Sequence, residues 1–176
     1  MNRRNLAFCL PVVLAACASP PSMPAAPVPD NLKPPAGEVP MTTVAARGVQ
    51  VYECRAKKDD PTAAEWAFVA PEADLFDAAG KPVGRHYAGP HWEAADGSRI
   101  VGSVKARADA PQAGAIPWLL LATKPDGGNG WFSKVTSIQR VRTVGGVAPA
   151  EACTSAQFGK TARVPYTADY VMYAAR

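Results

Sequence analysis

Short runs in which apolar and polar residues alternate dominate the chain from residue 47 onward. In residues 48–54 this alternation places Val49 and Val51 on one face of an extended segment and Tyr52 on the other. Residues 66–69 form a second run of the same kind. A period of two residues is typical of β-strands that are buried on one face, so we expect strands here.

Two polar turns divide the centre of the chain into hairpins. Residues 77–81 read Asp-Ala-Ala-Gly-Lys and residues 94–97 read Ala-Ala-Asp-Gly, and each separates two β-type runs. Asp-Gly between such runs is a strong signal for a tight turn. We therefore expect two consecutive β-hairpins within residues 74–104.

Three further runs extend the predicted sheet. Residues 116–121 read Ile-Pro-Trp-Leu-Leu-Leu, which predicts a strand buried on both faces. Residues 131–143 are rich in Val, Ile and Thr and predict one long strand, in which apolar residues recur at every third position, as a β-bulge would explain. Residues 164–173 predict a last, aromatic-rich strand.

The combined pattern indicates a mainly β fold. No stretch carries an apolar helical stripe longer than two turns. We therefore predict a single-domain sandwich or barrel of about eight strands over residues 41–176. A domain of this length can bury a sizeable core.

The start of the chain has the features of a lipoprotein signal peptide, which we assign to residues 1–16. Two arginines are followed by the apolar run 6–14 and two alanines, the order typical of a secretory signal. The apolar run is too short to span a bilayer. Because Cys17 directly follows Leu-Ala-Ala, we expect cleavage before it and lipidation of its thiol. The alternative is an ordinary signal peptide cut nearby, with Cys17 incidental.

Residues 17–40 are dense in proline, which favours an extended polyproline conformation and predicts a tether. The last part of the tether, residues 31–40, is expected to pack against the domain. The mature protein is then expected to be exported and held to the cell envelope by its lipid anchor. In a Gram-negative cell, Ala18 after the cysteine favours the outer membrane, with the domain facing the periplasm.

Loss of the signal peptide lowers the charge of the protein. The whole chain carries a formal net charge of +4, and removal of Arg3 and Arg4 leaves 4 − 2 = +2. No cluster of Lys and Arg with interleaved aromatic residues follows. Nucleic-acid binding therefore has no support in the sequence.

Cys54 and Cys153 remain after signal removal and lipidation. Two cysteines in an oxidising compartment allow one pairing. A bridge between them would close a loop of about 100 residues, for which the chain-entropy model gives about 4–5 kcal/mol of stabilisation. The alternative is two free thiols, buried and apart.

Nine segments of the chain, in this order, resemble a known family of exported bacterial and fungal proteins. They lie at residues 48–54 (Gly-Val-Gln-Val-Tyr-Glu-Cys), 66–68, 71–75, 86–93, 96–98, 116–120, 138–141, 143–146 and 164–170. On these residues the chain resembles the domain of unknown function 3455 family over most of residues 40–173. The resemblance implies export and one domain, and it brings no established activity or catalytic residue.

Both histidines lie in the densest polar segment, residues 86–98. With a carboxylate and a third ligand from elsewhere, His86 and His91 could bind zinc or a similar ion. Residues five apart on a strand face opposite sides, however, so the intervening Gly-Pro would have to turn the chain back. The simpler interpretation is that His86 hydrogen-bonds within the hairpin and His91 is exposed. The family pattern, in which threonine often stands at the position of His91, also weighs against the metal site.

Glu93 and Asp96 are candidates for general acid–base catalysis. Asp96 precedes a glycine and is explained more simply as a turn residue. The sequence contains no nucleophile elbow, phosphate-binding glycine loop or paired Cys-x-x-Cys motif. An envelope hydrolase that uses His86 and Glu93, with or without a metal ion, is therefore an alternative function rather than the preferred one.

Aromatic residues near turns favour ligand binding. Trp92 and Trp131 adjoin turns, and with Tyr87 they could line a groove and stack on a sugar or another flat ligand. Trp66 and Trp118 lie in apolar runs, so we expect both in the core.

Arg140 and Arg142 lie two residues apart on a predicted strand and are expected to share a face. This pair could bind an acidic group. A solvated sheet face is the simpler interpretation of the same pattern.

These patterns together predict a lipid-anchored envelope domain that binds an unidentified ligand or protein, without a cofactor and without catalysis. A structural protein that contacts other envelope proteins through a sheet edge is a third possibility.

Overall fold

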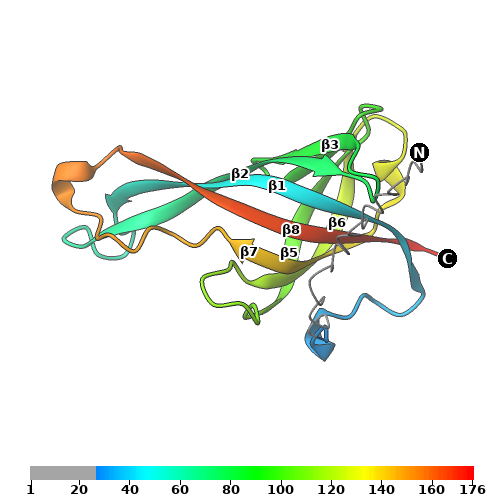
Figure 1. Ribbon diagram of the computed structural model, residues 1–176, viewed down its shortest axis with the longest axis horizontal. Helices are drawn as coiled ribbons and strands as arrows, with labels where there is room; N and C mark the ends of the chain where they lie inside the picture. Colours follow the sequence, from blue (N-terminus) through cyan, green and yellow to red (C-terminus); the bar gives the residue numbers. More distant parts are fainter. Residues whose placement is uncertain (1–26) are drawn as a thin grey trace, which may run out of the picture.

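The computed structural model describes residues 27–176, whose strands form one closed antiparallel barrel. The strands are β1 (Glu38–Ala56), β2 (Ala64–Phe76), β3 (Pro82–Tyr87), β4 (His91–Ala94), β5 (Arg99–Ala108), β6 (Trp118–Gly127), β7 (Ser137–Gly145) and β8 (Thr161–Ala175). Each strand pairs with the next, and β8 pairs with β1 to close the ring (Figure 1). The predicted sandwich or barrel of about eight strands is therefore a barrel.

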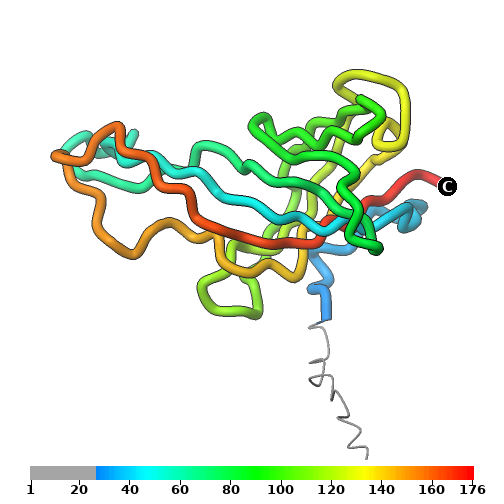
Figure 2. Tube along the Cα trace, turned by 45° about the horizontal axis from the view of Figure 1, so that its top comes forward, coloured from blue at the N-terminus to red at the C-terminus, as the bar shows by residue number. Residues whose placement is uncertain are grey.

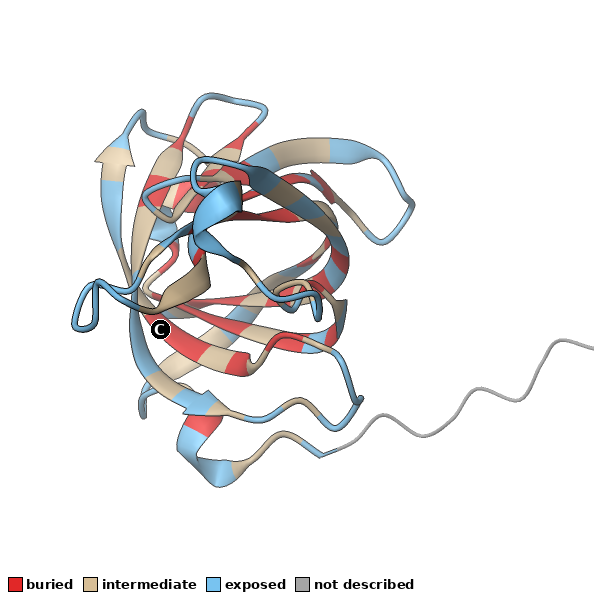
Figure 3. Ribbon diagram, turned by 90° about the vertical axis from the view of Figure 1, so that its left-hand side faces the viewer, coloured by how far each residue is buried: buried red, intermediate tan, exposed pale blue. Residues whose placement is uncertain are grey.

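Three neighbouring strands, β2, β1 and β8, are the longest and continue beyond the others as a twisted ribbon (Figure 1). Seen from the end where they project, the strands form a ring (Figure 3). We call the end from which β2, β1 and β8 project the open end of the barrel. Because successive strands are antiparallel, the connections β1–β2, β3–β4, β5–β6 and β7–β8 all lie there.

The opposite, plugged end is closed by the connection between β6 and β7. Within it a 3-10 helix, η2 (Phe132–Lys134), inserts Phe132 into the core, where its exposed fraction is 0%. The Phe132 N–H donates to the hydroxyl of Ser98, which is itself buried (3.0 Å). This end of the barrel is therefore filled by side chains.

The prediction of one long strand over residues 131–143 is wrong at its beginning. Hydrogen bonds between Ser133 and Gly130 hold a tight turn there, and β7 begins only at Ser137. The turn overrides the β propensity of this Val- and Thr-rich stretch. The predicted bulge is present: the pairing of β7 with β8 shifts between Val141 and Val144.

The predicted burial of residues 116–121 on both faces is confirmed, although β6 begins at Trp118. Leu121 packs in the barrel core, whereas Trp118 packs on the outer face against Leu32. Leu32 belongs to a short 3-10 helix, η1 (Asp30–Leu32), and is fully buried. A segment N-terminal to β1 therefore covers the outside of β6.

The boundary of the domain was placed at residue 41, with residues 31–40 expected to pack against it, and this packing is confirmed. The Gln139 side chain donates to the Leu32 carbonyl (2.6 Å), and β1 starts at Glu38. The proposed signal peptide, residues 1–16, and Cys17 lie outside the described residues. Within residues 27–176, no helix is both long and apolar enough to cross a membrane.

Both predicted turns and the predicted disulfide are confirmed. The turns at residues 77–81 and 94–97 connect β2 to β3 and β4 to β5. Cys54 and Cys153 form a disulfide, which joins the end of β1 to the β7–β8 connection. These two segments lie side by side at the tip of the ribbon (Figures 1 and 2). Trp66, expected in the core, is only half-buried beside them and donates to the Glu151 carbonyl (2.9 Å).

Candidate functional site: a cavity that opens through the barrel wall

The shortness of β3 and β4 leaves a lateral slot in the barrel wall. β2 pairs with β3 only from Ala73 onward, and β5 pairs with β4 only as far as Val101. Residues 68–72 of β2 and 103–108 of β5 therefore border the gap that these two short strands leave. We define these two stretches, with the β3–β4 turn at their base, as the lateral slot.

A cavity of about 570 Å³ lies inside the barrel behind the slot. Most of its wall is aliphatic or aromatic. The lining residues are Gln50, Tyr52, Phe68, Val69, Pro71, His86, Gly89, Pro90, Trp92, Val104, Arg107, Ile116, Pro117, Leu119, Leu121, Arg140 and Tyr170.

The rim of the slot is apolar and solvent-accessible. Phe68, Val69 and Val104 are 51%, 49% and 56% exposed, although each is a large hydrophobic side chain. All three also line the cavity. Contiguous apolar surface at the mouth of a cavity marks a binding site more often than single exposed apolar residues do.

His86 lies in the cavity wall, stacked on Trp92 with ring centroids 4.1 Å apart. Its Nδ1 lies 2.8 Å from the His91 carbonyl, which can only accept, so we place the ring proton on Nδ1. Burial lowers the pKa of His86 to about 3. The ring is therefore neutral at physiological pH and its Nε2 is an acceptor. The predicted hydrogen bond of His86 within the hairpin is present.

Two further polar groups in the wall have unused donors. Trp92, which the sequence placed near the surface, is 1% exposed, and its Nε1 has no hydrogen-bond partner among the described residues. Gln50 is 2% exposed, and its Nε2 likewise lacks a partner within residues 27–176. Unpaired buried donors are uncommon in folded proteins.

Arg140 also faces the cavity. Its Nε and Nη2 donate to the Pro117 carbonyl at 3.1 and 2.9 Å. Burial raises the pKa of Tyr170, and the Arg140 guanidinium partly opposes that rise. Arg140 therefore places a positive charge at the cavity wall.

The expectation that Arg142 shares the face of Arg140 is wrong. Arg142 adopts a positive φ of 49° at the bulge in β7. Its side chain instead forms an ion pair with Asp169 on the outer face. Of the two arginines, only Arg140 lines the cavity.

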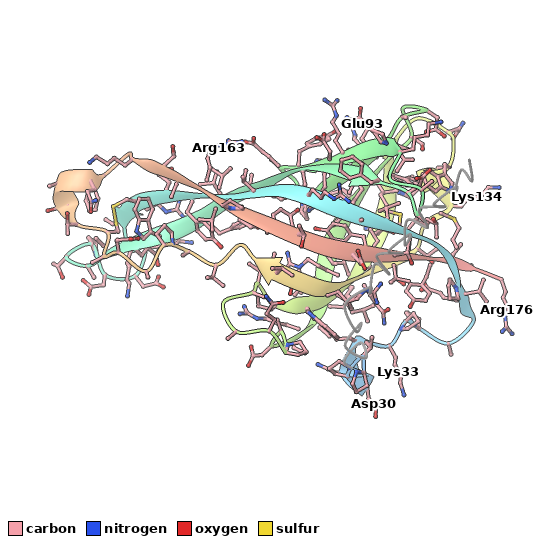
Figure 4. All side chains as sticks on the ribbon, viewed as in Figure 1. Asp30, Lys33, Glu93, Lys134, Arg163 and Arg176 are labelled. Carbon is pink, nitrogen blue, oxygen red and sulfur yellow. A yellow bond between two sulfur atoms is a disulfide. The ribbon has the colours of Figure 1, made fainter. Side chains whose placement is uncertain are left out.

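Glu93 does not join His86. It follows Trp92 on β4 and lies on the outer face, where it accepts hydrogen bonds from Tyr87 (2.6 Å) and Arg85 (2.9 Å) (Figure 4). These bonds lower its pKa, so the carboxyl group is ionised at neutral pH. The structure therefore separates the two residues of the predicted hydrolase site.

The two histidines also face different surroundings. His91 stacks on Tyr87, and its Nε2 lies 2.9 Å from an Asp126 oxygen. No group of three His, Cys, Asp or Glu side chains suited to a metal ion occurs within residues 27–176. Asp96 accepts hydrogen bonds from Ser98 and from the Trp131 N–H, which fix the turn it was expected to form.

Two of the four predicted binding residues, Trp92 and Arg140, line the cavity. Tyr87 lies on the outer face with Glu93, and Trp131 packs half-buried against the core. The sequence prediction missed Gln50. The sequence contained a clue to it, because Gln50 is a polar residue at a position of β1 whose side chain points inward, as those of Val44 and Ala46 do.

Fold and site together define a closed eight-stranded antiparallel barrel with an apolar internal cavity that opens through its wall. Residues 35–174 match the family described as Protein of unknown function (DUF3455), and the chain belongs to that family. The resemblance predicted from the sequence is thereby confirmed. No curated protein and no solved structure gives a significant match.

Proposed function

We propose that this protein is an exported lipoprotein whose barrel binds a small, largely apolar molecule without catalysing a reaction on it. The observation that carries ligand binding is the cavity of about 570 Å³. This volume is within the roughly 300–1,000 Å³ typical of small-molecule sites, which combine apolar walls with a few polar groups. Small eight-stranded barrels have room for one such ligand.

The polar groups in the wall suit binding better than catalysis. They are a neutral imidazole, a carboxamide, an indole N–H and a guanidinium, from His86, Gln50, Trp92 and Arg140. Groups of this kind orient a ligand through hydrogen bonds. The carboxylate that a hydrolase would pair with His86 lies on the other face of the sheet.

Binding is tested by titrating the purified protein with dodecanol and following tryptophan fluorescence, because Trp92 lies in the cavity wall. We expect saturable binding that Leu119→Trp weakens at least tenfold, since the larger side chain fills the cavity. Val144→Trp is the matched control, because Val144 is exposed and does not line the cavity. Absence of saturable binding, or equal weakening in both variants, would contradict the proposal.

The anchoring part of the proposal rests on the sequence around Cys17. The Cys54–Cys153 disulfide supports export, because disulfides persist mainly in oxidising compartments. We expect the wild-type protein to take up labelled palmitate and fractionate with membranes. Cys17→Ser should abolish both properties, whereas an unacylated wild-type protein would rule out the anchor.

A partner protein that adds a strand at the lateral slot is a second candidate. The unpaired edges of β2 and β5, together with the exposed apolar rim, favour it. Such a partner would protect the backbone amides of residues 103–108 from hydrogen exchange, whereas dodecanol supplies no backbone groups to do so.

A further inference from the structure

Arg140 is a half-buried cation in a largely apolar cavity, and none of the ion pairs formed within residues 27–176 includes it. The Pro117 carbonyl satisfies part of the guanidinium but supplies no negative charge. A charge removed from water is costly unless an opposite charge or several hydrogen bonds compensate. A counter-charge is therefore missing at this position.

The titratable side chains that line the cavity with Arg140 do not supply that negative charge. Tyr52 and Tyr170 both line the cavity, and burial raises the pKa of each, so both phenols are neutral at physiological pH. His86 is neutral as well. No carboxylate from residues 27–176 lines the cavity.

The guanidinium of Arg140 also determines which ligand groups it can bind. An arginine side chain can only donate hydrogen bonds. The unpaired nitrogens of Gln50 and Trp92 have almost no accessible surface, so the binding of the ligand is assigned to Arg140 alone. An oxygen-rich, negatively charged group could accept from the Arg140 guanidinium. Charge-assisted hydrogen bonds of this kind are about twice as strong as neutral ones.

We infer that the ligand is an anionic amphiphile, an organic acid with an apolar body, whose acid group is bound by Arg140 inside the barrel. This inference rests on the proposed binding function and adds the chemical class of the ligand. The apolar body lies along Leu119 and Leu121 and reaches solvent through the lateral slot. Arg107, a second cation at the rim, favours the approach of an anion.

The test compares probes that share a twelve-carbon chain and differ in charge. Dodecanoate, dodecanol and dodecyltrimethylammonium are titrated against the purified protein at pH 7.5 by calorimetry. We expect dodecanoate to bind at least about tenfold more tightly than dodecanol, as one charge-assisted hydrogen bond would give. The cation should bind most weakly.

Arg140→Gln should remove the preference for the acid while leaving the affinity for dodecanol within about threefold. Arg140→Lys, which keeps the charge but loses the planar fork, should retain part of the preference. Arg142→Gln is the matched control, because Arg142 lies two residues away on the outer face and should leave the preference intact.

Equal binding of acid and alcohol by the wild-type protein would overturn the inference and leave the proposed function standing. A preference that survives Arg140→Gln would also overturn it. If neither probe binds, the proposed function fails together with the inference. The comparison of three probes on the wild-type protein needs no variant, so the test holds even if Arg140→Gln does not fold.

Discussion

At the scale of single residues, a buried histidine makes the barrel sensitive to mild acid. In the unfolded chain His86 takes up a proton below its ordinary pKa of 6.5, whereas in the folded protein it does so only near pH 3. Between these values the unfolded state binds more protons. The stabilisation is complete above pH 6.5 and is lost as the pH falls toward 3.

We predict that the free energy of unfolding decreases by up to about 1.4 kcal/mol per pH unit below pH 6.5 because of His86. His86→Phe keeps a ring that can stack on Trp92 but cannot titrate, so its slope between pH 6.5 and 5 should be smaller. Urea unfolding at several pH values measures both slopes. Carboxylates such as Glu93, whose pKa is lowered, contribute mainly at lower pH. Parallel slopes for the two proteins would contradict the prediction.

Sequence reasoning at this scale succeeded where the chemistry is local. Asp96 was expected to fix a turn, and it does so through bonds to residues close in sequence. Trp92 was placed near the surface because it adjoins a turn, yet its ring is enclosed by strands that come from distant parts of the chain. Arg142 turns outward because of one positive φ, which the residue type alone does not indicate.

At the scale of elements, the segment before β1 packs on the barrel, although the sequence assigned it to the tether. Leu32 packs on Trp118, Leu120 and Val141, and its carbonyl accepts from Gln139. The same glutamine accepts a hydrogen bond from the Tyr173 hydroxyl (2.6 Å). A short, proline-flanked helix is thus fixed to the barrel by one buried side chain and one buried amide.

We predict that Leu32→Ala lowers the free energy of unfolding by about 2–3 kcal/mol, the cost typical of a buried leucine truncated to alanine. Limited proteolysis should also cut residues 27–37 faster in this variant. Asp30→Ala is the control, because it removes only the exposed ion pair with Lys33 (Figure 4). Equal stability of the two variants would show that the segment is not docked in solution.

The hairpins were predictable because Asp-Gly and Gly-Lys turns carry their signal in consecutive residues. The start of β1 was not, since Pro40 continues the proline-rich composition of the tether and no turn signal separates the two segments. These residues are extended because β8 pairs with them along their length. Tertiary pairing therefore decides where β1 begins.

At the scale of the whole molecule, the disulfide secures the open end. It joins positions 99 residues apart and holds the β7–β8 connection against the end of β1. That connection contains little regular structure, only η3 (Ser155–Gln157). A crosslink here restricts the unfolded chain and also limits motion at the tip of the ribbon.

We predict that reduction, or the double variant Cys54→Ala/Cys153→Ala, lowers the free energy of unfolding by as much as about 4–5 kcal/mol. Thermal unfolding with and without a reducing agent measures the loss. Hydrogen exchange should increase first in residues 146–160. A melting temperature unchanged by reduction would contradict the prediction that the bridge stabilises the protein.

Neither the closure of the barrel nor the lateral slot could be predicted from local sequence patterns. Alternating strands predict an antiparallel sheet, but the pairing of β1 with β8 joins segments far apart in the sequence. The slot depends on the difference in length between the β3–β4 hairpin and its neighbours, and strand ends are weakly encoded. The cavity could therefore be found only in three dimensions.

The contact between Asn31 and Arg107 also limits how far the lateral slot can lie from a membrane to which the protein is anchored. The Asn31 amide donates to the Arg107 carbonyl at 3.0 Å, so the tether leaves the barrel beside the rim of the slot. With Cys17 lipidated as proposed, nine residues lie between the anchor and Pro27, and even a fully extended chain over these ten Cα–Cα steps spans at most about 35 Å. The mouth of the cavity would then stay within a short distance of the lipid surface. An amphiphile leaving the membrane could reach the barrel without diffusing far through water.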